Sequence, residues 1–318
     1  MQTAMPEANE PKRQAARGAP DLQRSNILVV GLARNCARHI ETDIAKLRLA
    51  LASFPNLYWL VIESDSSDDT NKRLEALALQ ISNFRHLSLG ALRKKMPFRT
   101  ERIAHCRNKY LQEIRENPLY ESINYMIVAD LDGLNDSINE QALLSCWTRD
   151  DWDVCTANQR GPYYDVWTLR HSVWSPNDCF EQARFLMQQG ISSEKALSAA
   201  VFSRMIRIPE NAEWIAVDSA FGGLAIYRRE VIGSARYVGL NDAGQEVGEH
   251  VAFHYSLKKT GAKIFINPKF INASYTEHTQ HFLPLGQLKR KCKLLLRAGI
   301  VKVTGASGLL RFKTMVSK

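Results

Sequence analysis

Short apolar runs separated by polar segments set the pattern of the first half of the chain. Two of them, Asn26–Ala33 and Leu57–Ile62, are rich in β-branched or aromatic residues, and a third, YMIVAD, ends at Asp130. Runs of this kind are typical of parallel strands that are buried on both faces. Between the second and third runs, Arg102–Leu111 has the spacing of an amphipathic helix. The pattern predicts an α/β fold with a mostly parallel central sheet flanked by helices.

The second half of the chain contains patterns for the elements that would complete such a domain. Asp151–Asn158 is expected to form a strand, and Asn177–Arg207 is helix-rich and expected to form a lid or an insert. A helix is expected to begin at Glu249, and Lys263–Asn267 is expected to form a further strand. This half should therefore supply the second wall of any site that the first half begins.

Acidic residues stand where two of the predicted strands end. Asp130 and Asp132 are two positions apart, so on a strand both carboxylates project from one face and can reach one divalent cation or its diphosphate ligand. Glu63 directly follows the run Leu57–Ile62, at the carboxyl end of a strand, where open α/β sheets bind ligands. The Ser and Asp residues after Glu63 are expected to cap the next helix, and a direct ligand contact from them stays open.

Three other positions are candidates for ligand binding. Arg107 is polar within the amphipathic helix, where it either pairs with a phosphate or lies on a solvated face. Gly222 and Gly223 have no Cβ, so the backbone there can approach a sugar closely. The alternative for the two glycines is a bulge at the start of a strand.

The chain resembles GT-A-fold glycosyltransferases through a set of segments that occur in a fixed order. Within that superfamily it is most similar to the fungal capsule-associated mannosyltransferase family, through RIAHCRN, IVADLDG, NQRGPYYDVWTLRH, FGGLAIYR and GEHVAFH. The resemblance extends from about Asn26 to His281. It implies a GT-A fold and transfer of a sugar from a nucleoside-diphosphate donor, with a divalent metal between the D-x-D carboxylates and the diphosphate.

The same resemblance implies roles for residues at the donor end of the site. Glu63 would touch the nucleoside, Arg107 would lie near the ribose or the phosphates, and Asp130 and Asp132 would hold the ribose and the metal. The implied donor-binding set is Arg34, Glu63, Arg107, Asp130, Gly222 and Gly223.

At the acceptor end, Glu249 and His250 occupy the place where many GT-A enzymes carry a Glu-Asp pair. In inverting members the Asp of that pair is the general base, so the presence of His250 leaves the identity of the base open. A carboxylate near a cation stays ionised, and a neutral imidazole can accept a proton near pH 7. The implied catalytic residues are Asp132, Glu249 and His250. The aromatic segment around Asp165 is expected to bind sugar, because aromatic faces suit sugar C–H surfaces.

Histidines offer two candidate metal positions. By resemblance, His278 would join Asp130 and Asp132 as a ligand of Mn²⁺ or Mg²⁺, with His281 as the alternative. His250 and His254 are four positions apart on a helix, a spacing that can hold a transition metal. Without an H-E-x-x-H pattern, the favoured interpretation of that second pair is two hydrogen-bonded histidines that face the core.

The function that these patterns favour is metal-dependent glycosyl transfer from a GDP- or UDP-linked sugar, with mannose as the first donor sugar to test. The acceptor would be a hydroxyl of a glycan or a lipid-linked glycan, in surface polysaccharide synthesis. One alternative is a nucleotidyltransferase acting on sugar phosphates, but GLARNC after the first strand lacks the Gly-rich loop of that class. The other is a non-catalytic nucleotide- or glycan-binding protein.

Composition indicates the boundaries of the domain. The chain has 318 residues, 45% of them hydrophobic, which is enough for one large domain over residues 26–282. Residues 1–25 are polar and rich in Pro and Ala, which predicts disorder. Without an apolar signal segment, and with six cysteines in no paired spacing, the protein is expected to be cytoplasmic.

The tail, residues 283–318, carries most of the charge asymmetry. From Leu285 to Lys318 the chain has nine Lys and Arg residues and no Asp or Glu, while the whole chain has a formal charge of +9. This basic amphipathic pattern favours a peripheral contact with an anionic membrane surface; the alternative is a terminal helix packed on the domain. Nucleic-acid binding is not expected, because basic residues are not interleaved with aromatics over the domain.

Overall fold

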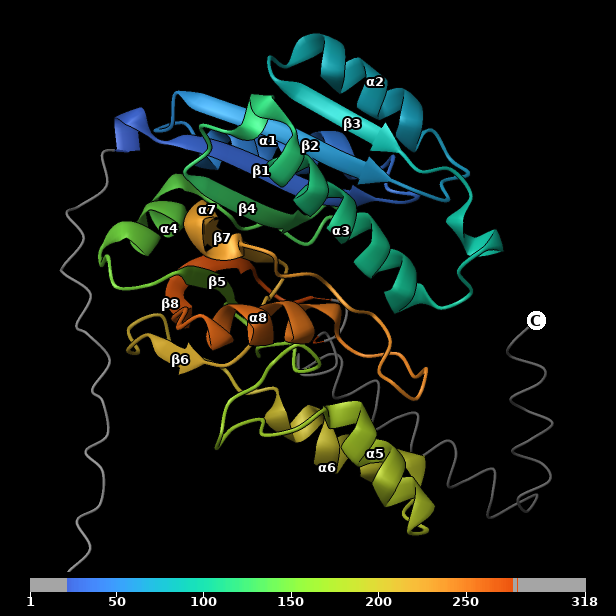
Figure 1. Cartoon of the computed structure of the whole chain (residues 1–318). Coiled ribbons are helices and arrows are strands. Elements are labelled where there is room, and N and C mark those ends of the chain that lie inside the picture. Colours follow the sequence, from blue (N-terminus) through green and yellow to red (C-terminus); the bar gives the residue numbers. More distant parts are fainter. Residues whose placement is uncertain (1–21, 277–278, 280–318) are drawn as a thin grey trace, which may run out of the picture.

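The computed structural model describes residues 22–276 and residue 279. One eight-stranded sheet lies at its centre, in the order β3-β2-β1-β4-β7-β5-β8-β6 (Figure 1). The strands are β1 (Asn26–Ala33), β2 (Asn56–Glu63), β3 (Phe84–Ser88), β4 (Tyr125–Asp130), β5 (Val154–Gln159), β6 (Ile215–Val217), β7 (Leu224–Arg228) and β8 (Ile264–Ala273).

The sheet is mixed but mostly parallel. Strand β1 pairs in parallel with β2 and β4, β2 with β3, and β5 with β8. Strand β7 is antiparallel to both β4 and β5, and β6 is antiparallel to β8. Six of the eight strands therefore run in the same direction. The predicted α/β class, with a mostly parallel sheet flanked by helices, is confirmed.

Helices cover both faces of this sheet. Helices α1 (Ile40–Ala50), α2 (Thr70–Gln80) and α4 (Glu140–Leu144) pack on one face. Helices α3 (Arg99–Glu116) and α8 (Glu249–Lys259) pack on the other face, as do α5 (Cys179–Gln188), α6 (Ser193–Ala200) and the short α7 (Arg229–Ile232). Single 3₁₀ turns connect these elements at Leu22–Arg24, Leu92–Lys94, Pro118–Tyr120, Ser145–Trp147 and Phe202–Arg204.

Burial on both faces explains the continuous apolar runs in the sequence. In β1, Leu28 and Val30 belong to the hydrophobic cluster on the α3 side, while Ile27 and Val29 belong to the cluster on the α1 side. All four side chains are 0–2% exposed. These four positions take apolar residues because neither face of the strand meets water there.

The element predictions are confirmed in position, with corrected bounds. β1 has the predicted limits, α3 is longer than predicted, and β5 begins at Val154. β4 ends at Asp130, so Asp132 lies beyond the strand. The strand-alternation argument for a common face of Asp130 and Asp132 is therefore wrong for Asp132, which the following turn positions instead.

The segment that was predicted to be helix-rich forms α5 and α6, which stand at the edge of the domain away from the β1–β3 end of the sheet (Figure 1). The N-terminal disorder prediction needs a correction: residues 22–24 form a 3₁₀ turn and Ser25 is buried, because Leu22 packs against the α1-side cluster. Residues 1–21 and the tail, residues 283–318, lie outside the described residues. Within the described residues, no helix combines the length and the apolar character needed to cross a membrane.

Candidate active site

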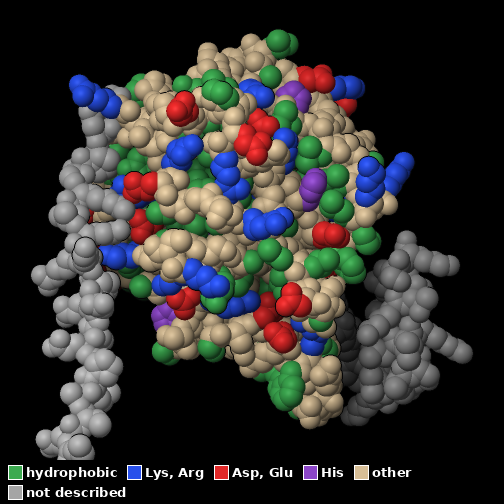
Figure 2. All heavy atoms as spheres, in the orientation of Figure 1, with side chains coloured by type: hydrophobic (Ala, Val, Ile, Leu, Met, Phe, Trp, Pro, Cys, Tyr) green, Lys and Arg blue, Asp and Glu red, His purple; other side chains and the backbone are tan. Residues whose placement is uncertain are grey.

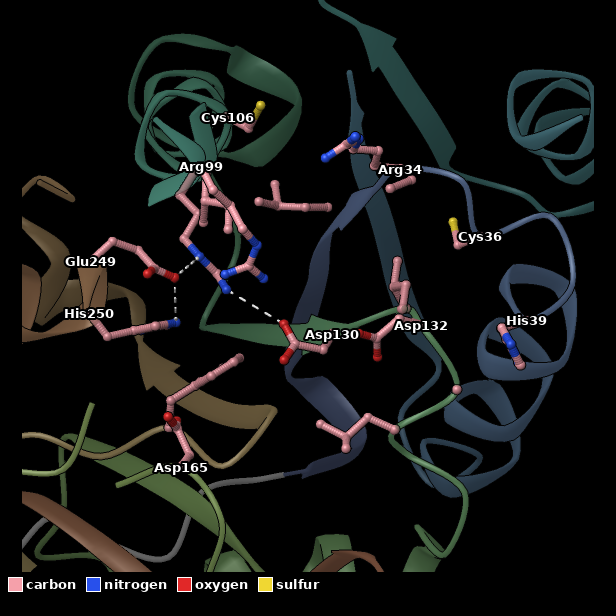
Figure 3. A pocket seen from close by; sticks show the side chains of 18 of the residues that line it. Arg34, Cys36, His39, Arg99, Cys106, Asp130, Asp132, Asp165, Glu249 and His250 are labelled. Carbon is pink, nitrogen blue, oxygen red and sulfur yellow. Dashed lines mark hydrogen bonds and ion pairs between the residues drawn. The ribbon is translucent and has the colours of Figure 1, made fainter. Parts of the chain in front are cut away.

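A pocket of about 790 Å³ opens at the carboxyl ends of β1 and β4, between them and the first turns of α3 and α8. Carboxylates gather around it: Asp130 and Asp132 on one side, with Asp165 and Glu249 facing them (Figure 3). The arginine side chains of Arg34 and Arg99 also line it. The carboxyl ends of parallel strands are where open α/β sheets bind ligands, so this pocket is the candidate active site.

Asp130 is fixed at the pocket by its backbone. Its N–H donates to the carbonyl of Gly223 at 2.9 Å, and its own carbonyl accepts from the Asn135 side-chain amide at 2.7 Å. The side chain keeps 33% of its surface exposed, toward the pocket. Asp132 is exposed two residues later, and the turn that follows it is held by Asp43, which accepts the Gly133 N–H at 2.8 Å. The structure thus brings the two predicted metal carboxylates to the same cavity.

Arg107 lies in a cage of acidic and aromatic side chains. Its Nε is 3.1 Å from Oε1 of Glu249, and its Nη2 is 3.5 Å from Oδ1 of Asp130. The guanidinium carbon lies 5.1 Å from the ring centre of Phe221 and 5.6 Å from that of Tyr237. The residue is only 4% exposed. Arg107 is therefore a counter-ion for two carboxylates, and because it also lines the pocket, its predicted contact with a phosphate or the ribose stays a prediction.

Burial and nearby charges strongly shift the pKa of Asp130. The pKa of its carboxyl is raised to about 8: burial is the main cause, Arg107 opposes the shift, and the nearby Asp132, Asp165 and Glu249 add to it. Asp165 is affected in the same way: burial raises its pKa, although the Gly222 N–H at 3.0 Å stabilises its charged form. Both shifts disfavour the charged carboxylates, and a cation bound between them would favour the charged forms.

A hard divalent cation fits this donor set. Carboxylate oxygens are the ligands that Mg²⁺ and Mn²⁺ prefer, and Asp132 projects into the pocket next to Asp130. Within residues 22–276 and 279, however, no three acidic, His or Cys side chains converge closely enough to form a complete metal site. His278 and His281, the predicted third ligand and its alternative, lie outside the described residues.

Glu63 does not line the pocket. Its side chain is fully buried, with Oε1 accepting the Ser66 N–H at 2.9 Å and Oε2 accepting the Ser88 hydroxyl. These contacts fix the loop that follows β2. Both carboxylate oxygens thus have partners within the protein, and the predicted contact between Glu63 and a nucleoside stays a prediction.

Glu249 and His250 lie at the opposite wall, in the first turn of α8 (Figure 3). His250 is 1% exposed and stacks on Phe221 with ring centres 4.0 Å apart. Burial, the nearby Arg107 charge and His254 hold the pKa of His250 well below 6.5. A lowered pKa makes the imidazole a weak base, which favours Glu249 of the two candidates that the sequence left open.

The structure supports the core interpretation of His254. Its Nδ1 is 2.9 Å from the Ser219 hydroxyl and its Nε2 is 2.8 Å from the Tyr227 hydroxyl. Both ring nitrogens are thus used inside the protein, and the residue is 0% exposed. The spacing of His250 and His254 reflects two histidines packed in the core.

Gly222 and Gly223 form a turn that no other residue type would fit. Both have positive φ angles, +69° and +83°, which side-chain-bearing residues rarely adopt. A Cβ on Gly223 would lie 2.0 Å from Leu134 Cδ2, and one on Gly222 would lie 2.9 Å from the Ala157 carbonyl. Neither glycine is among the residues that line the pocket. Their described role is to let this turn reach β4 and hold Asp130; a direct sugar contact stays a prediction.

Sequence reasoning missed two contributors to the site. Arg99 begins α3 and lines the pocket, and Asp43 supports the loop of Asp132 from α1. Asp165 lies in the aromatic segment that is expected to bind sugar, and the structure places it at the pocket, facing the Asp130 side. Arg99 and Asp43 carried no motif, and only the fold shows that they belong to the site. Arg34, which was predicted to bind the donor, is exposed and lines the pocket.

The chain is similar to solved structures at low sequence identity. No protein-family model and no curated protein matches the chain. Among solved structures, a mannosyltransferase from Pyrobaculum calidifontis in complex with GDP-Man and Mn²⁺ is 15% identical with a TM-score of 0.46, covering 82% of this chain. Glucosyl-3-phosphoglycerate synthase from Mycobacterium tuberculosis is 14% identical with a TM-score of 0.39, covering 94% of this chain and 85% of its own.

A third structure, GalNAc-T7 with UDP, GalNAc and Mn²⁺, is 15% identical with a TM-score of 0.42, covering 78% of this chain. This chain spans 60% of the length of the Pyrobaculum enzyme and 43% of that of GalNAc-T7. Similarity at this level does not assign a substrate, and the resemblance to the fungal capsule-associated family stays a prediction.

Proposed function

We propose that the protein is a metal-dependent glycosyltransferase that moves a sugar from a nucleoside-diphosphate donor to a hydroxyl of a glycan or lipid-linked glycan. The observation that carries this proposal is the convergence of Asp130, Asp132, Asp165 and Glu249 on one pocket at the carboxyl ends of parallel strands. A diphosphate is itself anionic, so a pocket lined by several carboxyl groups needs a cation to admit it. A divalent metal on the carboxylates meets that need.

The donor end would be built from the β1 and β4 edges of the pocket. Asp130 and Asp132 would hold the metal, which supplies charge neutralisation for a departing diphosphate when it is bound. Arg34 and Arg99 line the same pocket and are exposed, so their guanidinium groups are available to pair with phosphate oxygens. Arg107 keeps Asp130 in place from behind.

The acceptor end would lie near Glu249. Arg107 fixes this carboxylate, and Asp165, Tyr164 and Trp167 line the adjoining part of the pocket. Aromatic faces suit the C–H surface of a sugar ring, and carboxylates accept hydrogen bonds from its hydroxyls. If the reaction requires a general base, Glu249 is the better candidate, because the low pKa of His250 makes that imidazole a weak acceptor of protons.

The donor is expected to be GDP- or UDP-linked, and GDP-mannose is the first to test because of the sequence resemblance. A donor panel tests the proposal: the full-length protein is incubated with Mn²⁺ and each common nucleotide sugar, and release of nucleoside diphosphate is measured with and without candidate acceptors. Release from at least one donor, dependent on metal, is the expected result.

Release from none of the donors, with the fold verified by circular dichroism, would overturn glycosyl transfer. In that case, binding of a nucleotide without turnover would favour a non-catalytic binding protein. The Asp132→Asn variant serves as the control in every assay, because Asp132 is exposed and its loss should not disturb the fold.

A further inference from the structure

One segment at the mouth of the pocket is strongly basic. Residues 91–99, with the sequence ALRKKMPFR and here called the basic loop, lead into α3. The segment contains no acidic residue, and its four cations are all exposed: Arg93, Lys94, Lys95 and Arg99.

The described domain as a whole has almost no net charge. Residues 22–276 together carry 30 Lys and Arg against 29 Asp and Glu. The basic loop itself therefore carries four positive charges in a body whose overall excess is one. Among the described residues, none of the ion pairs involves any of these four side chains. Such a concentration attracts an anionic surface at long range.

The basic loop is held in one shape by the protein beneath it. Nη1 of Arg102 donates to the carbonyls of Met96 and Pro97 at 2.7 and 2.8 Å. The N–H of Arg93 donates to Oδ1 of Asp65 at 2.9 Å, and Leu92 is buried in the core. The exposed cations are therefore presented from a fixed backbone.

An exposed aromatic residue accompanies the cations. Phe98 is 43% exposed at the residue before α3, and Met96 beside it is half-buried. Apolar side chains next to Lys and Arg are the composition of protein surfaces that lie in the lipid headgroup region. A site for a small soluble anion has no need of an exposed phenylalanine, whereas a lipid surface offers both anionic headgroups and an apolar layer.

The basic loop lies next to the pocket opening. Arg99 lines the pocket, whereas Arg93, Lys94 and Lys95 do not. Figure 1 shows the segment between β3 and α3 at one edge of the domain, and in Figure 2 Lys and Arg side chains gather at that edge. A surface that meets these cations would therefore lie beside the opening of the pocket.

We infer that the basic loop docks the protein on an anionic lipid surface, with Phe98 entering the headgroup layer. Docking there brings the pocket mouth to the lipid, where a lipid-linked acceptor would be within reach. This inference does not depend on the proposed reaction, because membrane contact is measured without turnover. It is also separate from the predicted membrane contact of the tail, which lies outside the described residues.

The test is a vesicle-binding series with the full-length protein. Lys94→Gln combined with Lys95→Gln removes two cations from the basic loop, and Lys195→Gln combined with Lys269→Gln removes two exposed cations elsewhere as the matched control. Each variant is sedimented with vesicles of phosphatidylcholine alone and of equimolar phosphatidylcholine and phosphatidylserine. Because every variant keeps the tail, any contribution of the tail is the same in all of them.

The basic-loop variant should bind the anionic vesicles about 25-fold more weakly than the wild type, roughly fivefold for each cation removed. The control should bind like the wild type, and raised salt should weaken both. Phe98→Ala should lower binding in a way that lower salt does not restore. Release of nucleoside diphosphate from a soluble donor should be unchanged in the basic-loop variant.

Equal vesicle binding by the basic-loop variant and the control would overturn the inference. So would equal binding of the wild type to neutral and anionic vesicles. Loss of activity toward a soluble anionic glycan with unchanged vesicle binding would also overturn it, and would assign the same cations to acceptor recognition.

Discussion

Nε of Arg107 lies 3.1 Å from Oε1 of Glu249, and this contact joins α3 to the first turn of α8 across the candidate active site. The same guanidinium reaches Asp130 at 3.5 Å, so one buried cation connects the metal end and the acceptor end of the pocket. Neither carboxylate has another arginine or lysine within ion-pair distance among the described residues. The geometry of both ends depends on this single side chain.

Arg107→Met should destabilise the protein by about 3–5 kcal/mol, because it leaves two carboxylates without their buried counter-ion. Chemical denaturation measures the effect. Arg107→Lys should recover only part of the loss, since an ammonium cannot make the planar contacts of a guanidinium. Recovery of full stability and turnover by the lysine variant would show that only the charge matters. Arg48→Met, which removes an exposed cation of α1 that has no ion pair among the described residues, is the control.

Asp132→Asn should lower kcat by about 100-fold or more while leaving the fold intact, because it removes one negative charge from the metal position with little change in volume. Turnover at saturating Mn²⁺ and the circular dichroism spectrum are the two measurements. Asp218→Asn, which changes an exposed carboxylate at the end of β6, should be close to wild type. Full activity of the Asp132 variant would remove this carboxylate from the site.

Nucleoside diphosphate should raise the melting temperature only when Mn²⁺ or Mg²⁺ is present, because the carboxylates of the pocket repel the diphosphate without a cation between them. At a ligand concentration 100 times its dissociation constant, the stabilisation is about 2.7 kcal/mol. Thermal unfolding with and without chelator measures it. An equal shift in chelator would mean that Arg34 and Arg99 bind the diphosphate without a metal.

Glu249→Gln should spare the binding of free nucleoside diphosphate and reduce transfer to the acceptor, because Glu249 lies on the wall opposite Asp132 (Figure 3). Calorimetric affinity for GDP or UDP and the rate of transfer are compared in the same preparation. A loss of nucleotide affinity as large as the loss of turnover would contradict the placement of Glu249 at the acceptor end.

Stability should fall as the pH drops from about 6.5 toward about 3, in part because of His254. Burial lowers the pKa of this imidazole to about 3 in the folded protein, so over that range the unfolded chain binds a proton that the folded chain does not. This one residue contributes a slope of up to about 1.4 kcal/mol per pH unit, with stability rising as the pH rises. Above pH 6.5 both states are neutral at His254 and its contribution no longer changes.

Urea denaturation of the wild type and of His254→Gln at several pH values measures this slope. The variant should be less stable overall, since His254 bonds to Ser219 and Tyr227, but its stability should depend less steeply on pH. Parallel pH profiles for the two proteins would show that the His254 imidazole does not resist protonation in the fold.

The strands and the class of fold can be predicted from the sequence alone. A strand that is buried on both faces needs a continuous apolar run, and such a run is visible locally in the sequence, as in Asn26–Ala33. The sequence also indicated that Asp130 ends a strand and that Glu249 begins a helix, because both features belong to single elements.

The contacts between side chains that are distant in the sequence depend on the tertiary structure. Arg107 and Glu249 are 142 positions apart, and the two are brought together by the order of the sheet and the packing of α3 and α8. For the same reason Arg107 pairs with two carboxylates and Glu63 is buried with Ser66 and Ser88 as partners, contacts that no local pattern indicates. A charged side chain takes its role from the partners within a few ångströms of it, and those partners come from distant parts of the chain.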